Sequence, residues 1–255
     1  MKSSAKQSAP KDIPVVIFCG GRGSRLKEET EVIPKPLVPI AGRPILWHIM
    51  KIYYAQGFRH FILFLGYKGE QIESYARNHL RRSSERWTIT CLDTGLDTQT
   101  GGRLKQAQKL ITSPIFMLTY GDGVADVNLR KLLAFHQKEK RTATMTAVHP
   151  PVRFGEVVFN GNDVVAFREK PDPKRHRSEH LINGGFFVLD AEIFNHMSSD
   201  SQLVFERDVL SRLAKRRHLA ALPHRGYWQC MDTIRDKEVL NEAWGSGKAP
   251  WKLWD

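Results

Sequence analysis

The chain has 255 residues, of which 41% are hydrophobic, and its formal net charge is +12. This length suits one or two domains, and the composition supplies a sizeable apolar core, so an intrinsically disordered chain is excluded. No apolar run approaches the roughly 20 residues that span a bilayer, which argues against a membrane protein. Residues 1–12 lack the apolar segment of a signal peptide and are predicted to form a flexible polar tail.

The basic residues lie in short, scattered clusters, and none of these is interleaved with the aromatic side chains on which nucleic-acid bases stack. This distribution predicts a solvated surface that attracts small phosphorylated molecules rather than nucleic acid. Cys19, Cys91 and Cys230 lie far apart and form no CxxC pair. They are therefore expected to be reduced thiols in a cytoplasmic protein.

Strands and helices alternate through the first half of the chain. Apolar runs bounded by glycine or polar residues predict strands at 14–19, 58–65, 88–92, 115–119 and 143–148. Apolar residues at helical spacing predict helices at 45–56, 68–80, 102–111 and 129–138. This order favours βαβ units, and hence an α/β fold whose mostly parallel sheet is covered by helices on both faces.

The second half of the chain has a different pattern. Short β runs at 156–159, 164–168 and 186–189 are separated by turns, which predicts a small mixed or antiparallel β extension. Residues 203–217 are predicted to be helical. Because no internal repeat or linker is visible, residues 13–255 are expected to form one domain with a C-terminal elaboration.

A glycine-rich corner, GGRGSRL, follows the first predicted strand. In open α/β sheets ligands bind beyond the carboxyl ends of the strands. Gly20, Gly21 and Gly23 allow positive φ angles and the close approach of N–H groups to an anion. Arg25 supplies a bidentate phosphate donor, and Lys35 adds a positive charge between two prolines that restrict the backbone. The P-loop and GxGxxG motifs are not completed here, so a plain surface turn is the alternative.

Two aspartates and a Glu-Lys pair are further candidates. Asp122 follows a predicted buried strand in TYGDG, and Asp232 lies in QCMDT near the end of the chain. Together they could hold Mg²⁺, which prefers one or two carboxylates with waters and substrate phosphates. Glu169 could accept hydrogen bonds from sugar hydroxyls, and Lys170 could bind a phosphate. Each of these residues alone is as readily explained by a turn, a helix cap or a surface ion pair.

Asn183 and Gly184 precede an apolar run, where glycine permits close approach of a ligand or forms a hairpin turn. Several histidines, among them His48 and His136, invite a catalytic interpretation. No nucleophile motif such as GxSxG accompanies them. They are therefore expected to be packing or surface residues.

With these residues assembled, the chain resembles the sugar-1-phosphate nucleotidylyltransferases from about Val15 to Asp255. GGRGSRL is similar to the signature GGxGTRL of that family, and PKPLVPIAGRPIL is similar to the segment that follows it. The motifs LGYKGEQI, TYGDGVAD, INGGFFVL and the ending GKAPWKLWD look most like those of the bacterial glucose-1-phosphate cytidylyltransferases.

This resemblance implies a Rossmann-like fold and a Mg²⁺-dependent reaction in which a nucleoside triphosphate and a sugar 1-phosphate give a nucleotide sugar and pyrophosphate. CTP and glucose 1-phosphate are the expected substrates, and CDP-glucose for polysaccharide biosynthesis is the expected product. The implied nucleotide-binding residues are Gly20, Gly21, Gly23, Ser24, Arg25, Thr100, Gly101 and Arg103. The implied sugar-phosphate contacts are Glu169, Lys170, Asn183 and Gly184. The implied catalytic cations are Arg25, Lys35 and Lys170, and the implied metal ligands are Asp122 and Asp232.

The sequence departs from the family in one region that bears on specificity. The segment between Tyr75 and Asp93 is shorter than in the cytidylyltransferases. The resemblance therefore does not decide whether the chain forms a homo-oligomer, or which base or sugar contacts this segment makes. The alternatives are a uridylyl-, thymidylyl- or guanylyltransferase, a non-catalytic nucleotide-sugar-binding regulator and, from charge alone, a nucleic-acid binder.

Overall fold

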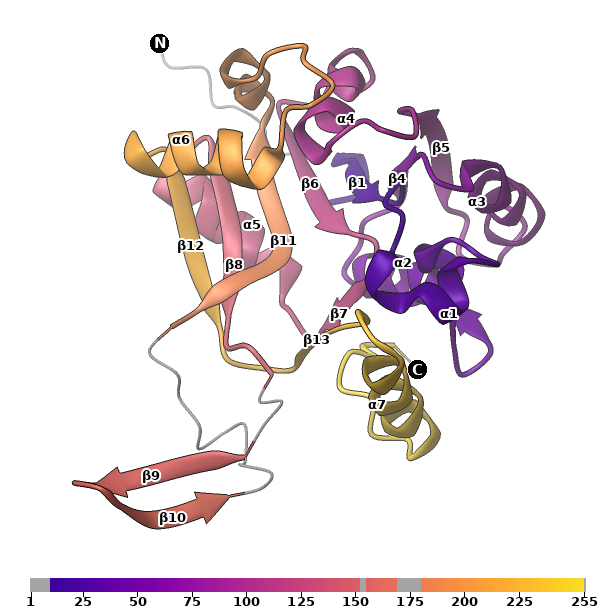
Figure 1. Ribbon diagram of the computed structural model, residues 1–255. Coiled ribbons are helices and arrows are strands. Elements are labelled where there is room, and N and C mark those ends of the chain that lie inside the picture. Colours follow the sequence, from indigo (N-terminus) through magenta and orange to yellow (C-terminus); the bar gives the residue numbers. More distant parts are fainter. Residues whose placement is uncertain (1–9, 152–154, 169–179, 255) are drawn as a thin grey trace.

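The computed structural model describes residues 10–151, 155–168 and 180–254. Its centre is a seven-stranded sheet with the strand order β12-β8-β11-β6-β1-β4-β5 (Figure 1). Neighbouring strands run parallel, except that β11 is antiparallel to both β6 and β8. The mostly parallel sheet is therefore confirmed. The strands are β1 Val15–Phe18, β4 His60–Leu65, β5 Thr88–Asp93, β6 Ile115–Tyr120, β8 Ala143–Val148, β11 Ile182–Asp190 and β12 Leu219–His224.

Helices cover both faces of this sheet. Successive residues of a strand point to opposite faces, so one strand can pack against helices on both sides. Val15 and Ile17 of β1 pack into an apolar cluster with α2 and α5, whereas Val16 packs into a second cluster with α4. The two clusters make β1 a strand buried on both faces, which explains its uninterrupted apolar run. The helices are α1 Lys27–Thr30, α2 Ile45–Ala55, α3 Gly69–Tyr75, α4 Thr100–Gln106, α5 Leu129–Glu139, α6 Ser211–Lys215 and α7 Ile234–Gly245.

Helix α2 shows why the helix predictions succeed. Among its fully buried residues, Ile45, Ile49, Ile52 and Tyr53 recur at the spacing of one helical face. The helix ends before Gly57, whose φ of 104° lets the chain turn toward β4. Local pattern and tertiary packing agree here, so residues 45–56 were predictable from periodicity.

The predicted β extension is confirmed for its first two runs, whereas the third run, 186–189, lies in β11 of the main sheet, antiparallel to its neighbours. β9 (Glu156–Asn160) and β10 (Asp163–Arg168) pair antiparallel in a hairpin that lies apart from the main sheet (Figure 1). A second small ladder pairs β7 (Gly123–Ala125) with β13 (Trp228–Cys230). This ladder was not predicted, because strands of three residues have too few positions to show a period.

Two predicted helices differ from the structure in detail. Residues 203–217 contain a π-helical turn at Phe205–Leu210 followed by α6, and the helix predicted at 68–80 likewise ends in a π-helical turn at Ala76–Leu80. Of the predicted N-terminal tail, only Pro10–Asp12 lie within the described residues, where they form a 3-10 turn. Among the helices described, none is long and apolar enough to cross a membrane.

Candidate active site

The glycine-rich corner opens into a hollow at the carboxyl ends of β1 and β6. The hollow has a volume of about 300 Å³. Its walls come from four separate segments: the corner itself, the proline-flanked lysine, the start of α4 and the end of β6. The predicted site residues that line it are Gly20, Gly21, Gly23, Ser24, Arg25, Lys35, Thr100, Arg103 and Asp122.

The three glycines of the corner do different work. A Cβ on Gly20 would lie 2.4 Å from Nη1 of Arg103, so this glycine makes room for the arginine. Gly23 has a φ of +65°, and a Cβ there would lie 3.1 Å from Cβ of Lys35. A Cβ on Gly21 would meet nothing within 4 Å. Gly20 and Gly23 are thus required for packing, whereas Gly21 leaves open space in the hollow.

Four predicted charged residues meet at one point. The Lys35 ammonium donates hydrogen bonds of 2.6 Å to Oδ2 of Asp122 and of 2.6 Å to Oδ1 of Asp232. Nη1 of Arg25 donates to the other oxygen of Asp232 at 2.7 Å. The Lys35 side chain is only 10% exposed, while that of Arg25 is 72% exposed. The fold therefore joins residues from positions 25 to 232 into one charged cluster, with Arg25 on its solvent side.

Within the cluster, Lys35 and Asp232 favour each other's charged forms. Burial alone would lower the pKa of Lys35, but the charges and hydrogen bonds of Asp122 and Asp232 raise it above its ordinary value. Burial alone would raise the pKa of Asp232, but Lys35 and then Arg25 lower it. At neutral pH the cluster is consequently an ammonium between carboxylates, beside a guanidinium.

The β7–β13 ladder holds the two aspartates together. The Asp122 carbonyl accepts a hydrogen bond of 2.8 Å from the Met231 N–H, just beyond the last ladder pair. Asp236, which is buried, accepts from the backbone N–H groups of Asp232 at 3.1 Å and of Thr233 at 2.9 Å. It also completes a capping box with Thr233 at the start of α7. Asp236 thus fixes the backbone that carries Asp232.

Asp122 and Asp232 fit a magnesium site. Both direct a carboxylate oxygen at the same Lys35 ammonium, which brings the two oxygens within reach of one cation. Within the described residues no group of three or more His, Cys, Asp or Glu side chains could hold a metal by itself. A cation between these aspartates would take its remaining ligands from water and substrate phosphates, as Mg²⁺ does in phosphate-transfer sites.

At the start of α4, the predicted nucleotide contacts are engaged with the protein. Arg103 is buried, and its guanidinium donates to the carbonyls of Leu65 at 2.8 Å, Gly95 at 2.8 Å and Gly20 at 3.2 Å. A Cβ on Gly101 would lie 2.8 Å from Leu203, so Gly101 permits close packing of α4. The structure thus gives Arg103 and Gly101 roles in shaping the site, and their direct contact with a nucleotide stays a prediction.

The predicted sugar contacts on β11 lie beside the hollow. Nδ2 of Asn183 donates to the Tyr120 hydroxyl at 3.1 Å, and Tyr120 lines the hollow. The Gly184 carbonyl accepts from Nε1 of Trp228 at 2.7 Å. Glu169 and Lys170 lie outside the described residues, so their placement stays a prediction.

The sequence analysis missed two residues of this region, Tyr120 and Glu206. Tyr120 had a signal, because it ends β6 directly before the glycine and aspartate of TYGDG. Glu206 had none, because its segment carried only a helical pattern.

His48 and His136 are packing residues, as expected. His48 is fully buried, and its Nε2 donates a hydrogen bond of 3.1 Å to the Ile40 carbonyl. Burial lowers its pKa to about 4. His136 lies between the Thr144 hydroxyl at 2.9 Å and Asp190 at 3.1 Å. Its side chain is 2% exposed, so a substrate has no access to this arrangement.

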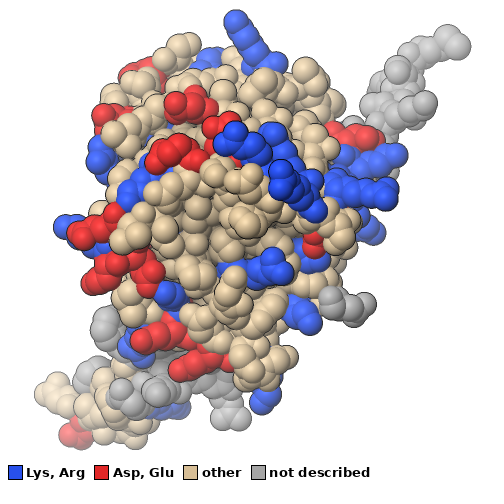
Figure 2. Space-filling view, turned by 90° about the vertical axis from the view of Figure 1, so that its right-hand side faces the viewer, with Lys and Arg blue, Asp and Glu red and all other residues tan. Residues whose placement is uncertain are grey.

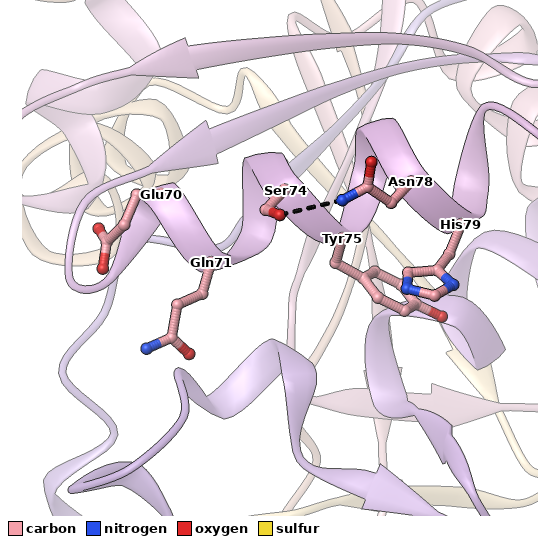
Figure 3. Close-up of a pocket in the computed structure, with 6 residues that line it drawn as sticks. All are labelled: Glu70, Gln71, Ser74, Tyr75, Asn78 and His79. Carbon is pink, nitrogen blue, oxygen red and sulfur yellow. Dashed lines mark hydrogen bonds between the residues drawn. The ribbon is translucent and has the colours of Figure 1, made fainter.

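A second hollow, of about 440 Å³, lies along α3 and the turn that follows it. Figure 3 shows its six lining side chains along one helical segment, with Asn78 donating a hydrogen bond to Ser74. None of them is a predicted site residue.

On the face shown in Figure 2, lysine and arginine side chains are interspersed with acidic ones over much of the surface. The charged cluster around Lys35 is therefore the candidate active site.

Comparisons with known proteins identify the family to which the chain belongs. The family model for nucleotidyl transferases matches residues 14–236. The chain belongs to the nucleotidyl transferase family, and it is thus a nucleotidyltransferase.

Two relatives are each 42% identical to the chain over 94% of its length and 99% of their own. They are the probable glucose-1-phosphate cytidylyltransferase of Bacillus subtilis and the glucose-1-phosphate cytidylyltransferase of Salmonella typhimurium. A D-glycero-alpha-D-manno-heptose 1-phosphate guanylyltransferase of Aneurinibacillus thermoaerophilus is 34% identical over 77% of the chain and 83% of its own length. Among solved structures, HddC from Yersinia pseudotuberculosis complexed with GMP-PN has a TM-score of 0.70 at 24% identity, covering 91% of this chain and 99% of that one, which supports the fold.

Proposed function

We propose that this chain transfers a cytidylyl group from CTP to glucose 1-phosphate, giving CDP-glucose and pyrophosphate. The observation that carries the proposal is the convergence of Arg25, Lys35, Asp122 and Asp232 at the carboxyl edge of the sheet. This cluster occurs in a chain that is 42% identical, over nearly its whole length, to proteins named glucose-1-phosphate cytidylyltransferases. The family supports the reaction class, and the relatives support the base and the sugar.

The reaction is an in-line displacement at phosphorus. An oxygen of the sugar phosphate attacks the α-phosphorus of CTP, the bond from that phosphorus to the bridging oxygen breaks, and pyrophosphate leaves with the electron pair. The attacking oxygen is already ionised, so no general base is needed. Because both reactants are anions, the main task of the protein is to position them and offset their charge. A site that is rich in cations and has no histidine among the described residues that line it suits that task.

Each charged residue has a role that follows from its position. Arg25 is exposed beside the glycine corner, where its guanidinium can grip the triphosphate. Lys35 lies deeper, and its ammonium can pass from the carboxylates to a phosphate at the reacting centre. Gly21 leaves space in which the nucleotide can approach the backbone of the glycine corner. Glu169 and Lys170 are proposed to contact the sugar and its phosphate.

Mg²⁺ is the proposed cofactor, and Asp122 and Asp232 are its proposed ligands. When bound, the ion would neutralise negative charge on the triphosphate and on the leaving pyrophosphate. Each carboxylate directs an oxygen at the same Lys35 ammonium, and the lowered pKa of Asp232 favours the charged form that a cation requires. Lys35, which contacts both carboxylates, and Arg25, which contacts Asp232, balance their negative charge.

The location, the oligomeric state and the biosynthetic role of the protein are also part of the proposal. The unpaired state of Cys19, Cys91 and Cys230 supports a cytoplasmic location, where thiols stay reduced. A homo-oligomer and a place in polysaccharide biosynthesis are proposed from the resemblance alone.

A substrate matrix tests the proposal. The purified protein is assayed with CTP, UTP, dTTP and GTP against several sugar 1-phosphates in the presence of Mg²⁺, with pyrophosphate release as the measurement. CTP with glucose 1-phosphate is expected to give the highest kcat/KM. A different best pair, such as GTP with a heptose 1-phosphate, would overturn the substrate assignment and leave nucleotidyl transfer standing. Calorimetric binding of CTP without pyrophosphate release from any pair would indicate a non-catalytic regulator.

A further inference from the structure

One side of the hollow carries hydroxyl groups in place of charges. Thr100 and Tyr120 both line it, and both hydroxyls donate to the same carboxylate. Oγ1 of Thr100 donates to Oε2 of Glu206 at 2.7 Å, and the Tyr120 hydroxyl donates to Oε1 at 2.6 Å. Glu206 is not among the lining residues, so it supports the two hydroxyls from outside the hollow.

This arrangement fixes the direction of the hydrogen bonds. An ionised carboxylate only accepts, and a hydroxyl has a single proton to give. Both protons are therefore directed at Glu206. The oxygens also accept from the protein, Thr100 from the Phe205 N–H at 2.9 Å and Tyr120 from the side chain of Asn183 at 3.1 Å. Any remaining hydrogen-bonding capacity of either hydroxyl is that of an acceptor.

The segment that carries Glu206 is firmly held. Glu206 lies in the π-helical turn Phe205–Leu210, and such turns occur frequently at functional sites. The segment just before this turn is tied to the start of α4, because the Gln99 N–H donates to the Ser201 carbonyl at 2.8 Å.

We infer that Glu206 is a positioning residue that holds the Thr100 and Tyr120 hydroxyls as acceptors toward the hollow, so that the ligand groups facing them are hydrogen-bond donors. Sugar or ribose hydroxyls and an amino group of the base are such donors, whereas fully ionised phosphate oxygens are not. This inference deepens the proposed function and rests on it. The phosphates would then lie toward Arg25 and Lys35, and the uncharged parts of the substrates toward this wall.

The first test replaces Glu206 by glutamine, whose amide can donate to one hydroxyl and turn its proton toward the hollow. Glu206→Gln is expected to raise the KM for both CTP and glucose 1-phosphate about 10-fold, the cost of one misdirected hydrogen bond, and to change kcat by less than about threefold. Glu85→Gln, which alters a carboxylate paired with Lys51 on α2, is the matched control and should leave both KM values unchanged.

The second test asks whether Glu206 acts through the hydroxyls. Tyr120→Phe and Thr100→Val each remove one hydroxyl, and combining either with Glu206→Gln should give less than the product of the single effects. Thr100→Ser keeps the hydroxyl and should keep the wild-type KM for CTP. A structural role alone would lower Tm without this non-additivity, and strictly multiplicative effects would overturn the inference.

The outcomes also separate this inference from the proposed function. Wild-type turnover of CTP and glucose 1-phosphate with unchanged KM values in Glu206→Gln would overturn the inference alone. If the wild-type protein turns over no pair, calorimetric titration with CTP still decides, because equal CTP affinities of the wild type and Glu206→Gln contradict it. If Glu206→Gln does not fold, the comparison of Thr100→Val with Thr100→Ser, and Tyr120→Phe alone, carries the same prediction for KM.

Discussion

The two sides of the hollow differ in how the fold builds them. The charged side brings together Arg25, Lys35, Asp122 and Asp232 from distant positions, and these residues neutralise one another. The hydroxyl side depends on one carboxylate, Glu206, behind two neutral groups. The charged side suits phosphates and a cation, whereas the hydroxyl side suits the uncharged parts of a substrate. Substitutions on the two sides should therefore affect different kinetic constants.

The largest effect is expected on the charged side. Lys35→Ala and Asp122→Asn should each lower kcat for pyrophosphate release by on the order of 10²–10³, because each removes a preorganised charge from the reacting centre. Chelation of divalent metal by EDTA should abolish turnover, and added Mg²⁺ should restore it. Pyrophosphate release under saturating substrates is the measurement.

The matched control for Lys35→Ala is Lys51→Ala. Lys51 is also a largely buried lysine in an ion pair, with Glu85 at 3.0 Å, but it lies on α2 away from the hollow. Circular dichroism shows whether each variant folds. Near-normal kcat in folded Lys35→Ala, or an equal loss in Lys51→Ala, would remove the distinction between the charged side and the rest of the molecule.

A smaller effect is expected where the backbone of the charged side is held. Oδ2 of Asp236 accepts from the N–H groups of Asp232 and Thr233, and Oδ1 accepts from Nε2 of Gln229, so the amide nitrogen of Asp236→Asn opposes a donor in either orientation. Residues that orient metal ligands typically contribute about 10- to 100-fold to metal affinity, so we expect Mn²⁺ binding, measured by paramagnetic resonance, to weaken at least about 10-fold. Asp190→Asn, which alters a carboxylate paired with His136, should leave Mn²⁺ affinity unchanged. An unchanged affinity in Asp236→Asn would show that the β7–β13 ladder alone positions Asp232.

The glycine corner allows a comparison within three residues. Gly20→Ala forces a Cβ to within 2.4 Å of Arg103, and such overpacking costs about 1–3 kcal/mol of unfolding free energy. Gly21→Ala meets nothing within 4 Å, so its stability should stay within about 0.5 kcal/mol of wild type. The Gly21 variant should instead raise the KM for the nucleotide. Urea unfolding and steady-state kinetics measure the two effects, and equal stability of both variants would contradict the packing role of Gly20.

The fold was predictable where a local pattern and the tertiary environment agree. Strand β1 and helix α2 carry apolar runs with the correct period, and both have the expected bounds to within two residues. The β7–β13 ladder could not be found, because three-residue strands have no period and their pairing joins segments more than 100 positions apart. The same long-range pairing also determines where the residues of the site meet.

The candidate site was predictable as a set of residue types. Gly21, Arg25 and Asp122 follow strands, so their place at the carboxyl edge of the sheet follows from the order of elements. That Lys35 would bridge two aspartates depends on tertiary contacts that leave no local signal. The role of Glu206 was hidden for the same reason, because its partners Thr100 and Tyr120 are joined to it only in the folded chain.

The smallest effect is expected at the far end of the β7–β13 ladder. Nε2 of His224 lies 3.0 Å from Oδ1 of Asp126. Burial alone would lower the pKa of His224, but Asp126 and the Tyr227 carbonyl raise it above its ordinary value. The protonated histidine therefore stabilises the fold below about pH 6.5, and this contribution is lost as the pH rises through the raised folded-state pKa. His224→Gln should cost less than about 1 kcal/mol of unfolding free energy at pH 5.5, and still less at pH 9.

His60 provides a control of opposite sign, because burial lowers its pKa. Its neutral form is favoured in the folded chain, so wild-type stability falls as the pH drops through the ordinary histidine pKa. His60→Gln should consequently lose less stability, relative to wild type, at pH 5.5 than at pH 9. Urea unfolding of both variants at the two pH values measures this, and the same pH trend in both would contradict the His224–Asp126 pair. A fall in kcat of His224→Gln as large as that of Lys35→Ala would show that the far end of the ladder belongs to the charged side.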